Sequence, residues 1–380
     1  MLKFLILSVA LVCAVQGKKS KKGKKGGGLD CGMDAKIDDA LESPTKLQEL
    51  YEEYKAEHCV DHPEQQHTQR LEIFRKQLVT LQEMKKSKSV SWTVGITHLA
   101  HLTECEKQLF HGHNTTKHFG DEECDGYRPP DSLQGARPSG EEKLDPTWDW
   151  RTLGAVTPVK DKISDMTTGW AHAAVVPLEA AIFKRTGELH ELSVQELVDC
   201  TYKGVHHSID KEEGSVRDAW EYIMGMHRIG YARDLPETGT YGACDERITD
   251  APNAFEKFHL VEERRLPMGD HNDYHITFAV RKHGPVVVSM WAANAKLDTY
   301  KGGAYNPPSN CDDSFEHAMA IVGYVPEYWI IKNSWGTSWG DNGYMWWVRK
   351  GGHNCNILKK AYIPIIKERE TKDPSEGDHY

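Results

Sequence analysis

Apolar residues in the first third of the chain recur at the spacing of helices. A helix is predicted to start at Ser43-Pro44-Thr45, and its apolar stripe is Leu47, Leu50, Tyr51 and Tyr54. A second helix is predicted from Pro63 to about Lys86, with the stripe Leu71, Phe74, Leu78 and Leu81. Residues 91–96 are typical of a short strand. This part of the chain is therefore predicted to be mainly helical.

The later part of the chain mixes two kinds of apolar pattern. The run from Trp170 to Phe183 predicts a largely buried helix, and Ser215–Ile229 predicts another. Pro177 removes one backbone hydrogen bond from the first run, which allows a kink there. The continuous apolar run Ala318–Tyr324 is typical of a buried strand. This part of the chain is therefore predicted to contain both helices and strands.

The two ends and one internal stretch differ in composition from the rest. Residues 1–17 are typical of a secretory signal peptide, although a buried N-terminal strand is an alternative. Residues 18–28 form a basic arm rich in lysine and glycine, 121–142 a polar linker, and 367–380 a charged tail predicted to be disordered. No segment is long and apolar enough to predict a membrane span.

Charge is distributed unevenly along the chain. The formal net charge is −10, and residues 1–28 hold seven lysines and no acid, so the remainder carries −17. A basic arm on an acidic body can bind an acidic polymer through Lys18–Lys25, or fold back on its own domain. No feature predicts a nucleic-acid partner or a cofactor.

Three motifs follow one another along the chain: Gly169-Trp170-Ala171, Phe315-Glu316-His317-Ala318 and Lys332-Asn333-Ser334-Trp335-Gly336. In this order they resemble the motifs of papain-like cysteine peptidases such as cathepsin L. Residues 145–151 and 154–160 resemble the start of the mature family domain. The resemblance implies a papain-like, two-lobe α+β fold over residues 144–363, with one helical lobe, one lobe resembling a β-barrel, and a cleft that binds extended peptides.

The same resemblance assigns roles to the site residues. His317 matches the catalytic histidine, Asn333 the residue that orients it, and Trp335 and Trp339 the tryptophans that shield the pair. The position of the nucleophilic cysteine is Gly169, however, and the position of the oxyanion glutamine is Lys162. The loop between these two positions is one residue longer than in the family. We therefore predict a homologue that lacks peptidase chemistry.

Residues 45–110 resemble the inhibitory propeptide of the family, although few motif positions agree. Arg70 and Phe74 keep the family residues of the long helix, and Gly95 keeps the first residue of the motif that follows it. The position of this match, directly before the peptidase-like part of the chain, supports it. It implies that the chain's own propeptide is a partner of the cleft.

The cysteines fit a secreted protein with disulfides. The resemblance implies the bridges Cys200–Cys244 and Cys311–Cys355, while the family bridge beside the nucleophile has lost both its cysteines. The pairing of four upstream cysteines stays open; they are Cys31, Cys59, Cys105 and Cys124. Asn114 begins a glycosylation sequon. His111, His113 and His118 surround this sequon without a carboxylate, and no metal site is predicted.

The resulting prediction is a secreted, lysosomal or extracellular pseudoprotease with a retained cleft for peptides or protease inhibitors. Two alternatives remain. An atypical hydrolase would use the hydroxyl of Thr167 or Thr168 as its nucleophile. A structural matrix protein would attach through the basic arm. His317 and Asn333 also have a simpler interpretation, since a buried hydrogen-bonded pair can be kept by packing alone.

Overall fold

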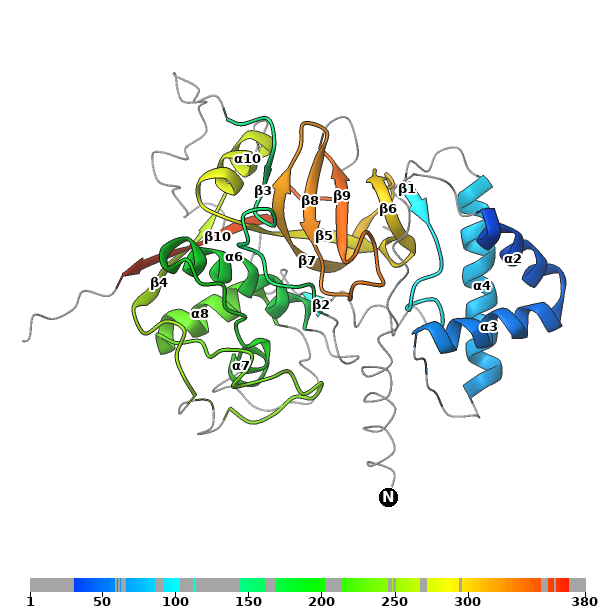
Figure 1. The fold of residues 1–380 in the computed structure, drawn as a ribbon, viewed down its shortest axis with the longest axis horizontal. Helices are drawn as coiled ribbons and strands as arrows, with labels where there is room; N and C mark the ends of the chain where they lie inside the picture. Colours follow the sequence, from blue (N-terminus) through cyan, green and yellow to red (C-terminus); the bar gives the residue numbers. More distant parts are fainter. Residues whose placement is uncertain are drawn as a thin grey trace, which may run out of the picture. The chain divides into compact units, whose positions relative to one another are not determined.

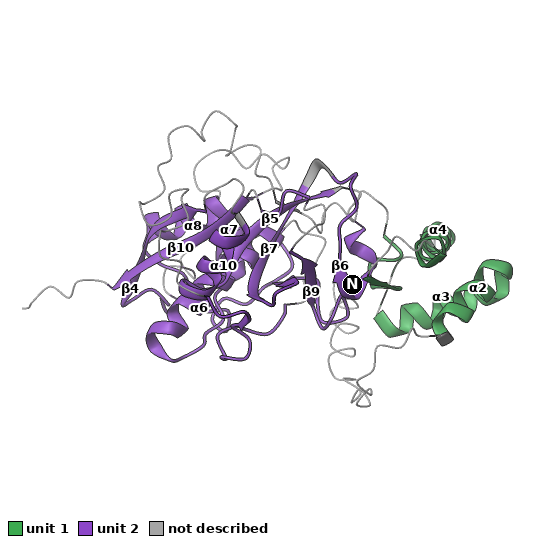
Figure 2. Cartoon of the chain, turned by 90° about the horizontal axis from the view of Figure 1, so that it is seen from above, with its two compact units in different colours: residues 1–103 green, residues 104–380 purple. Residues whose placement is uncertain are grey.

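The computed structural model describes residues 31–58, 60, 62, 66–86, 92–102, 112–113, 144–160, 168–201, 214–244, 248, 251–266, 272–293, 296–349, 355–358 and 360–368. Contacts divide the chain into two compact units, Met1–Thr103 and Glu104–Tyr380, which Figure 2 shows in different colours. Each unit has a hydrophobic core of its own.

The described part of the first unit contains three helices and a short strand. They are α2 (Cys31–Glu42), α3 (Pro44–His58), α4 (His67–Lys86) and β1 (Trp92–Val94). The predicted stripe of α3 is buried as expected, because its apolar residues pack against Phe74, Leu78 and Leu81 of α4. Helix α4 begins at His67 rather than near Pro63, and the strand is shorter than residues 91–96. Helix α2 was not predicted.

The second unit combines helices with a large, mainly antiparallel sheet (Figure 1). Its helices are α6 (Gly169–Thr186), α7 (Val194–Cys200), α8 (Val216–Met226) and α10 (Asn272–Lys282). Its main strands are β4 (Phe258–Arg265), β5 (Val286–Ala293), β6 (Tyr300–Tyr305), β7 (Asp312–Tyr324), β8 (Tyr328–Lys332), β9 (Tyr344–Val348) and β10 (Lys360–Glu368). They lie in the order β6-β9-β8-β7-β5-β10-β4, and only β6 and β9 pair in parallel. Two short strands, β2 (Gly112–His113) and β3 (Trp148–Asp149), pair with β7.

Helix α6 forms the centre of the helical part. All its residues from Gly169 to Ile182 are buried, because small alanine side chains let the neighbouring elements approach closely. Trp220 of α8 packs on it and donates from Nε1 to the Ala174 carbonyl at 3.1 Å. A Cβ on Gly214 would lie 2.3 Å from the Trp170 ring, so only glycine fits there. The helix continues through Pro177, where the sequence allowed a kink.

The second predicted helix of this unit is shorter than its sequence pattern. Helix α8 runs from Val216 to Met226, inside the predicted range 215–229. Ser215 and Asp218 form a reciprocal capping box, in which each side chain accepts from the backbone N–H of the other. The helix ends at His227, whose backbone is left-handed.

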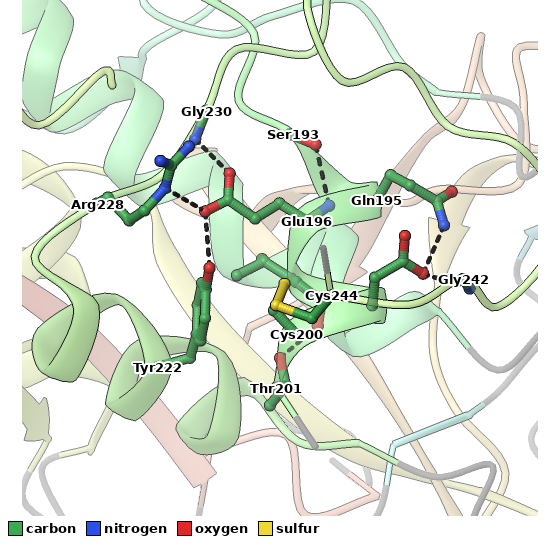
Figure 3. The surroundings of a disulfide bond; sticks show 12 residues. Ser193, Gln195, Glu196, Cys200, Thr201, Tyr222, Arg228, Gly230, Gly242 and Cys244 are labelled. Carbon is green, nitrogen blue, oxygen red and sulfur yellow. Dashed lines mark hydrogen bonds and ion pairs between the residues drawn. A yellow bond between two sulfur atoms is a disulfide. The ribbon is translucent and has the colours of Figure 1, made fainter. Parts of the chain in front are cut away.

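Both disulfides that the family resemblance implied are present, Cys200–Cys244 and Cys311–Cys355. Figure 3 shows that the first lies beside the fully buried carboxylate of Glu196. This carboxylate accepts from Tyr222 Oη at 2.8 Å, Arg228 Nε at 3.0 Å and the backbone N–H of Gly230 at 2.6 Å. The bridge and this carboxylate together fix the loop after α8 to α7.

Candidate functional site

Helix α6 begins at the residue that the family resemblance places at the nucleophile. Gly169 is the first helical residue, and Thr168 is its N-cap. The Thr168 carbonyl accepts from the backbone N–H groups of Ala171 and His172, but its hydroxyl does not cap the helix. Thr168 is fully buried, and its hydroxyl has no hydrogen-bond partner in the described part of the chain.

Two antiparallel strands bring His317 and Asn333 together. His317 lies within β7, and Asn333 directly follows β8; the pairing of Ala320 with Lys332 fixes the register of the two strands. His317 Nε2 and Asn333 Oδ1 are 2.9 Å apart. Both residues are buried, with 0% and 4% of their surface exposed. The sheet thus places a hydrogen-bonded pair of residues that are 16 positions apart in the sequence.

The hydrogen bonds of Asn333 also fix the proton on His317. Asn333 Oδ1 accepts from the backbone N–H of Ser334 at 2.9 Å, which identifies this atom as the amide oxygen. Because an amide oxygen only accepts, His317 Nε2 must donate to it. The His317 ring is therefore held in the tautomer, or the charged form, that carries a proton on Nε2.

Two tryptophans cover this pair, as the resemblance implied. The Trp335 ring stacks on the His317 ring at 4.8 Å between centroids, and the Trp339 ring meets Trp335 edge-on at 5.3 Å. Both tryptophans are almost fully buried. Their rings keep water from this side of the histidine, which strengthens its hydrogen bond to the amide.

A short extended segment of the chain itself lies on the strand that carries His317. In β2, Gly112 is paired with His317 and His113 with Glu316, in antiparallel register. The same segment also contacts α6, the helix that starts at Gly169. A short extended segment thus pairs with the sheet at His317.

Buried charged residues lie beneath this arrangement. Lys332 Nζ donates to the Thr157 hydroxyl at 3.0 Å, and this hydroxyl donates to Glu179 Oε2 at 2.7 Å. Glu179 Oε1 accepts from the backbone N–H of Leu192 at 3.0 Å. Burial lowers the pKa of Lys332 to about 8 and raises the pKa of Glu179. The Thr157 hydroxyl therefore links the amino group of Lys332 to the carboxyl group of Glu179, and both groups are buried.

A second buried histidine lies one turn into α6. His172 Nε2 is 3.2 Å from Glu237 Oε1, and only 3% of the His172 side chain is exposed. The contact connects α6 with the loop that the Cys200–Cys244 bridge closes. A carboxylate can only accept, so the pair places a proton on His172 Nε2.

Several predicted site residues lie outside the described residues. They are Lys162, Thr167, Asn114, His111, His118, the arm Lys18–Lys25, and three cysteines, Cys59, Cys105 and Cys124. Cys31 begins α2, but its side chain is not described, and His113 is described only through its backbone. In the described ranges, no group of three or more metal-ligating side chains comes together.

The sequence motifs did not indicate the buried charges of Glu179 and Lys332. Glu179 interrupts an apolar helical run, and Lys332 ends a buried strand directly before Asn333. A charged residue within an apolar run needs a buried partner, so the positions of these two residues in the sequence already indicated a buried polar contact. The partner itself could not be read from the sequence, because Thr157 and Lys332 are 175 positions apart.

Comparison with known proteins agrees with this architecture. Residues 144–365 match the family model described as papain family cysteine protease. The chain belongs to the papain family of cysteine proteases. Cathepsin L1 of Drosophila melanogaster is 30% identical over 295 residues, which cover 73% of each protein. Papain of Carica papaya is 30% identical over 329 residues, 86% of this chain and 89% of that protein.

Solved precursors of the family have the same fold. Digestive procathepsin L2 from the Tenebrio molitor larval midgut superposes with a TM-score of 0.70 at 25% identity, over 84% of this chain and 99% of that one. A recombinant stem bromelain precursor gives a TM-score of 0.69 at 26% identity, over 84% and 98%. The papain-like α+β fold predicted from the motifs is thus confirmed.

Proposed function

We propose that this protein is a papain-family homologue without cysteine-peptidase activity, whose cleft holds an extended peptide. The pairing of Gly112–His113 with His317–Glu316 carries this proposal, because it is how an extended peptide adds a strand to a sheet. Main-chain pairing of this kind requires no nucleophile. The peptide-binding part of the family's function can therefore persist where its chemistry is lost.

The loss of activity follows from the residue at the start of α6. A cysteine peptidase attacks the peptide carbonyl with a thiolate, and Gly169 has no side chain to supply one. Removing the nucleophile of a catalytic triad costs on the order of a millionfold in rate. Lys162, at the oxyanion position of the family pattern, adds a second loss, since the glutamine amide that would stabilise the oxyanion is absent from that position.

An activity assay tests the chemical half of the proposal. Purified full-length protein, and the same protein cut in the 121–142 linker by an added protease that is then removed, should not hydrolyse fluorogenic peptides. The variant Gly169→Cys should also stay inactive, because Lys162 and the longer loop remain, and a misplacement near ~1 Å can cost about a hundredfold. Turnover that a thiol-directed inhibitor abolishes in the unsubstituted protein would refute the proposal.

A binding assay tests the peptide half separately. Before any peptide is added, the proposed cleft is occupied by the chain's own residues Gly112 and His113, so added peptides must compete with them. Native and denaturing mass analysis of the linker-cut protein should show the N-terminal fragment retained without covalent linkage, once disulfides are reduced. An unrelated extended peptide in excess should release the fragment. A fragment that dissociates at once, from protein that then binds no peptide, contradicts a retained cleft.

The hydrolase alternative is less well supported by the site. A nucleophile must reach its substrate, whereas Thr168 is fully buried at the helix start. Loss of a measured hydrolytic activity in both Thr168→Ala and His317→Ala would nevertheless favour it. The matrix alternative rests on the arm Lys18–Lys25, outside the described residues. Salt-sensitive retention on an acidic polymer, lost on deleting residues 18–25, is its test.

The proposed location follows from the N-terminal sequence. Residues 1–17 are typical of a secretory signal, and we propose an extracellular or lysosomal protein glycosylated at Asn114. Over the described ranges, none of the helices has both the length and the apolar character that crossing a membrane requires. N-terminal sequencing of the secreted protein and a mobility shift after glycosidase treatment check this proposal.

A further inference from the structure

A small cavity lies inside the second unit, between α6 and the strands β7 and β8. Its polar lining comes from His172 and Glu179 of α6, Lys332 at the end of β8, Asn333 and Ser334 directly after it, and Thr157 and Lys160. Its volume is about 20 Å³, which is enough for one water molecule. The remaining walls are largely apolar and include Ala318 and Met319 of β7.

Three polar atoms of this lining stand without a protein partner. They are His172 Nδ1, Asn333 Nδ2 and Ser334 Oγ, and within the described part of the chain none of them makes a hydrogen bond. Their residues are only 4–6% exposed. A buried polar atom without a partner costs about 1–3 kcal/mol, so three around one cavity indicate an occupant.

The hydrogen-bonding roles of these atoms define what the occupant must be. Asn333 Oδ1 is already occupied by His317 and Ser334, so the amide presents its Nδ2–H donors to the cavity. His172 Nε2 donates to Glu237, so Nδ1 is the ring nitrogen left for the cavity, and it accepts in the neutral tautomer that this contact selects. The Ser334 hydroxyl can do both. The occupant must therefore both donate and accept.

The size and the donor–acceptor pattern select one kind of molecule. An anion would meet the lone pair of His172 Nδ1 and the carboxyl group of Glu179, and a cation would meet the N–H groups of Asn333 and the amino groups of Lys160 and Lys332, so neither kind of ion suits the whole lining. The volume of about 20 Å³ corresponds to one water molecule. Water accepts and donates, and it binds stably in a buried site with two to four polar partners.

We propose that this cavity is a structural water site. The water accepts from Asn333 Nδ2, donates to His172 Nδ1, and takes the Ser334 hydroxyl as its third partner. It joins the first turns of α6 to the chain that leaves β8, and so holds the amide that orients His317. This inference rests on buried polar atoms alone and holds whether or not the protein has activity.

Two serine variants provide a matched test. Ser334 lines the cavity, whereas Ser289 of β5 is equally buried, has a hydroxyl without a partner among the described residues, and lies outside the lining. Ser334→Ala removes a partner of the water and should lower the folding equilibrium constant of the full chain about fivefold to tenfold. Ser289→Ala removes only an unsatisfied hydroxyl and should leave that constant unchanged or raise it.

A crystal structure of the full chain at atomic resolution provides the second measurement. It should show a density peak within hydrogen-bond distance of His172 Nδ1, Asn333 Nδ2 and Ser334 Oγ, and the peak should weaken in Ser334→Ala. The inference is overturned if the unsubstituted protein shows no peak there. It is equally overturned if Ser334→Ala stabilises the fold as Ser289→Ala does, because the hydroxyl then had no partner to lose.

Discussion

Replacing Glu263 of β4 by glutamine should stabilise the protein at neutral pH. Burial raises the pKa of this carboxyl from 4.5 to about 7, and Glu221 and Asp218 of α8 add to the rise against the opposing effect of Arg217. The rise corresponds to an upper limit of about 3 kcal/mol, at about 1.4 kcal/mol for each pH unit between the two pKa values. Residual contact with water reduces this, and we expect about half.

The direction of the change in stability follows from its dependence on pH. A carboxyl whose pKa is raised by folding binds its proton more tightly in the folded state, so stability falls as pH rises from about 4.5 to about 7. Glu263→Gln cannot lose a proton and avoids this loss. The variant should therefore exceed the unsubstituted protein in unfolding free energy at pH 8, and the two should converge below pH 4.5.

Urea denaturation at several pH values measures this difference. All but one of the 11 tryptophans lie in the second unit, so tryptophan fluorescence follows the unit that contains Glu263. The matched control is Glu262→Gln, one residue away. Arg264 holds the pKa of Glu262 below its usual value, so this variant should lose a little stability at neutral pH. Equal stability of Glu263→Gln and the unsubstituted protein at pH 8 would refute the reasoning.

Three further stability predictions follow from the second unit, each measured by the same urea denaturation. Thr157→Val removes the hydroxyl that links the buried groups of Lys332 and Glu179, and it should lower the free energy of unfolding by about 3 kcal/mol. The control Thr157→Ser keeps the hydroxyl and should lower the free energy of unfolding much less. Equal losses in the two variants would contradict the bridging role of the hydroxyl. Gly214→Ala places a Cβ against the Trp170 ring and should cost about 1–3 kcal/mol. Its control is Gly225→Ala, in open space on α8, which should stabilise the helix by up to about 1 kcal/mol. Removing the Cys200–Cys244 bridge should cost about 4 kcal/mol by loop entropy, and a loss below 1 kcal/mol would mean that the contacts of Glu196 suffice to hold the loop.

The sequence predicted those elements whose signals are local. The stripe of α3 and the apolar run of α6 appear in the structure where periodicity placed them, because burial of one helix face repeats within a few residues. The strand of His317 is longer than its apolar run, since β7 begins at Asp312 and polar residues also join the ladder. Helix α2 was not predicted, although Met33, Ile37, Ala40 and Leu41 recur at helical spacing and pack in the core of the first unit.

The features that the sequence could not predict depend on distant partners. The two residues of β2 have no periodicity, and their pairing with His317 is a property of the folded chain. The contact of His172 with Glu237 spans 65 positions, and neither residue belongs to a motif used in the resemblance. The motifs located His317 and Asn333 only because other proteins of the family supply the pattern, which local physical signals do not contain.

Folding stability can explain why His317 and Asn333 are present, but it does not explain Gly169. Replacing Asn333 by an apolar residue would leave the buried His317 Nε2–H and the Ser334 N–H without their acceptor, at about 1–3 kcal/mol for each donor. Folding alone can therefore retain the pair, and its presence says little about turnover. Gly169 differs, because glycine in a helix is less favourable than almost any other residue. The informative residue of the site is thus the glycine, since the histidine pair would be kept whether or not the protein ever cut a peptide.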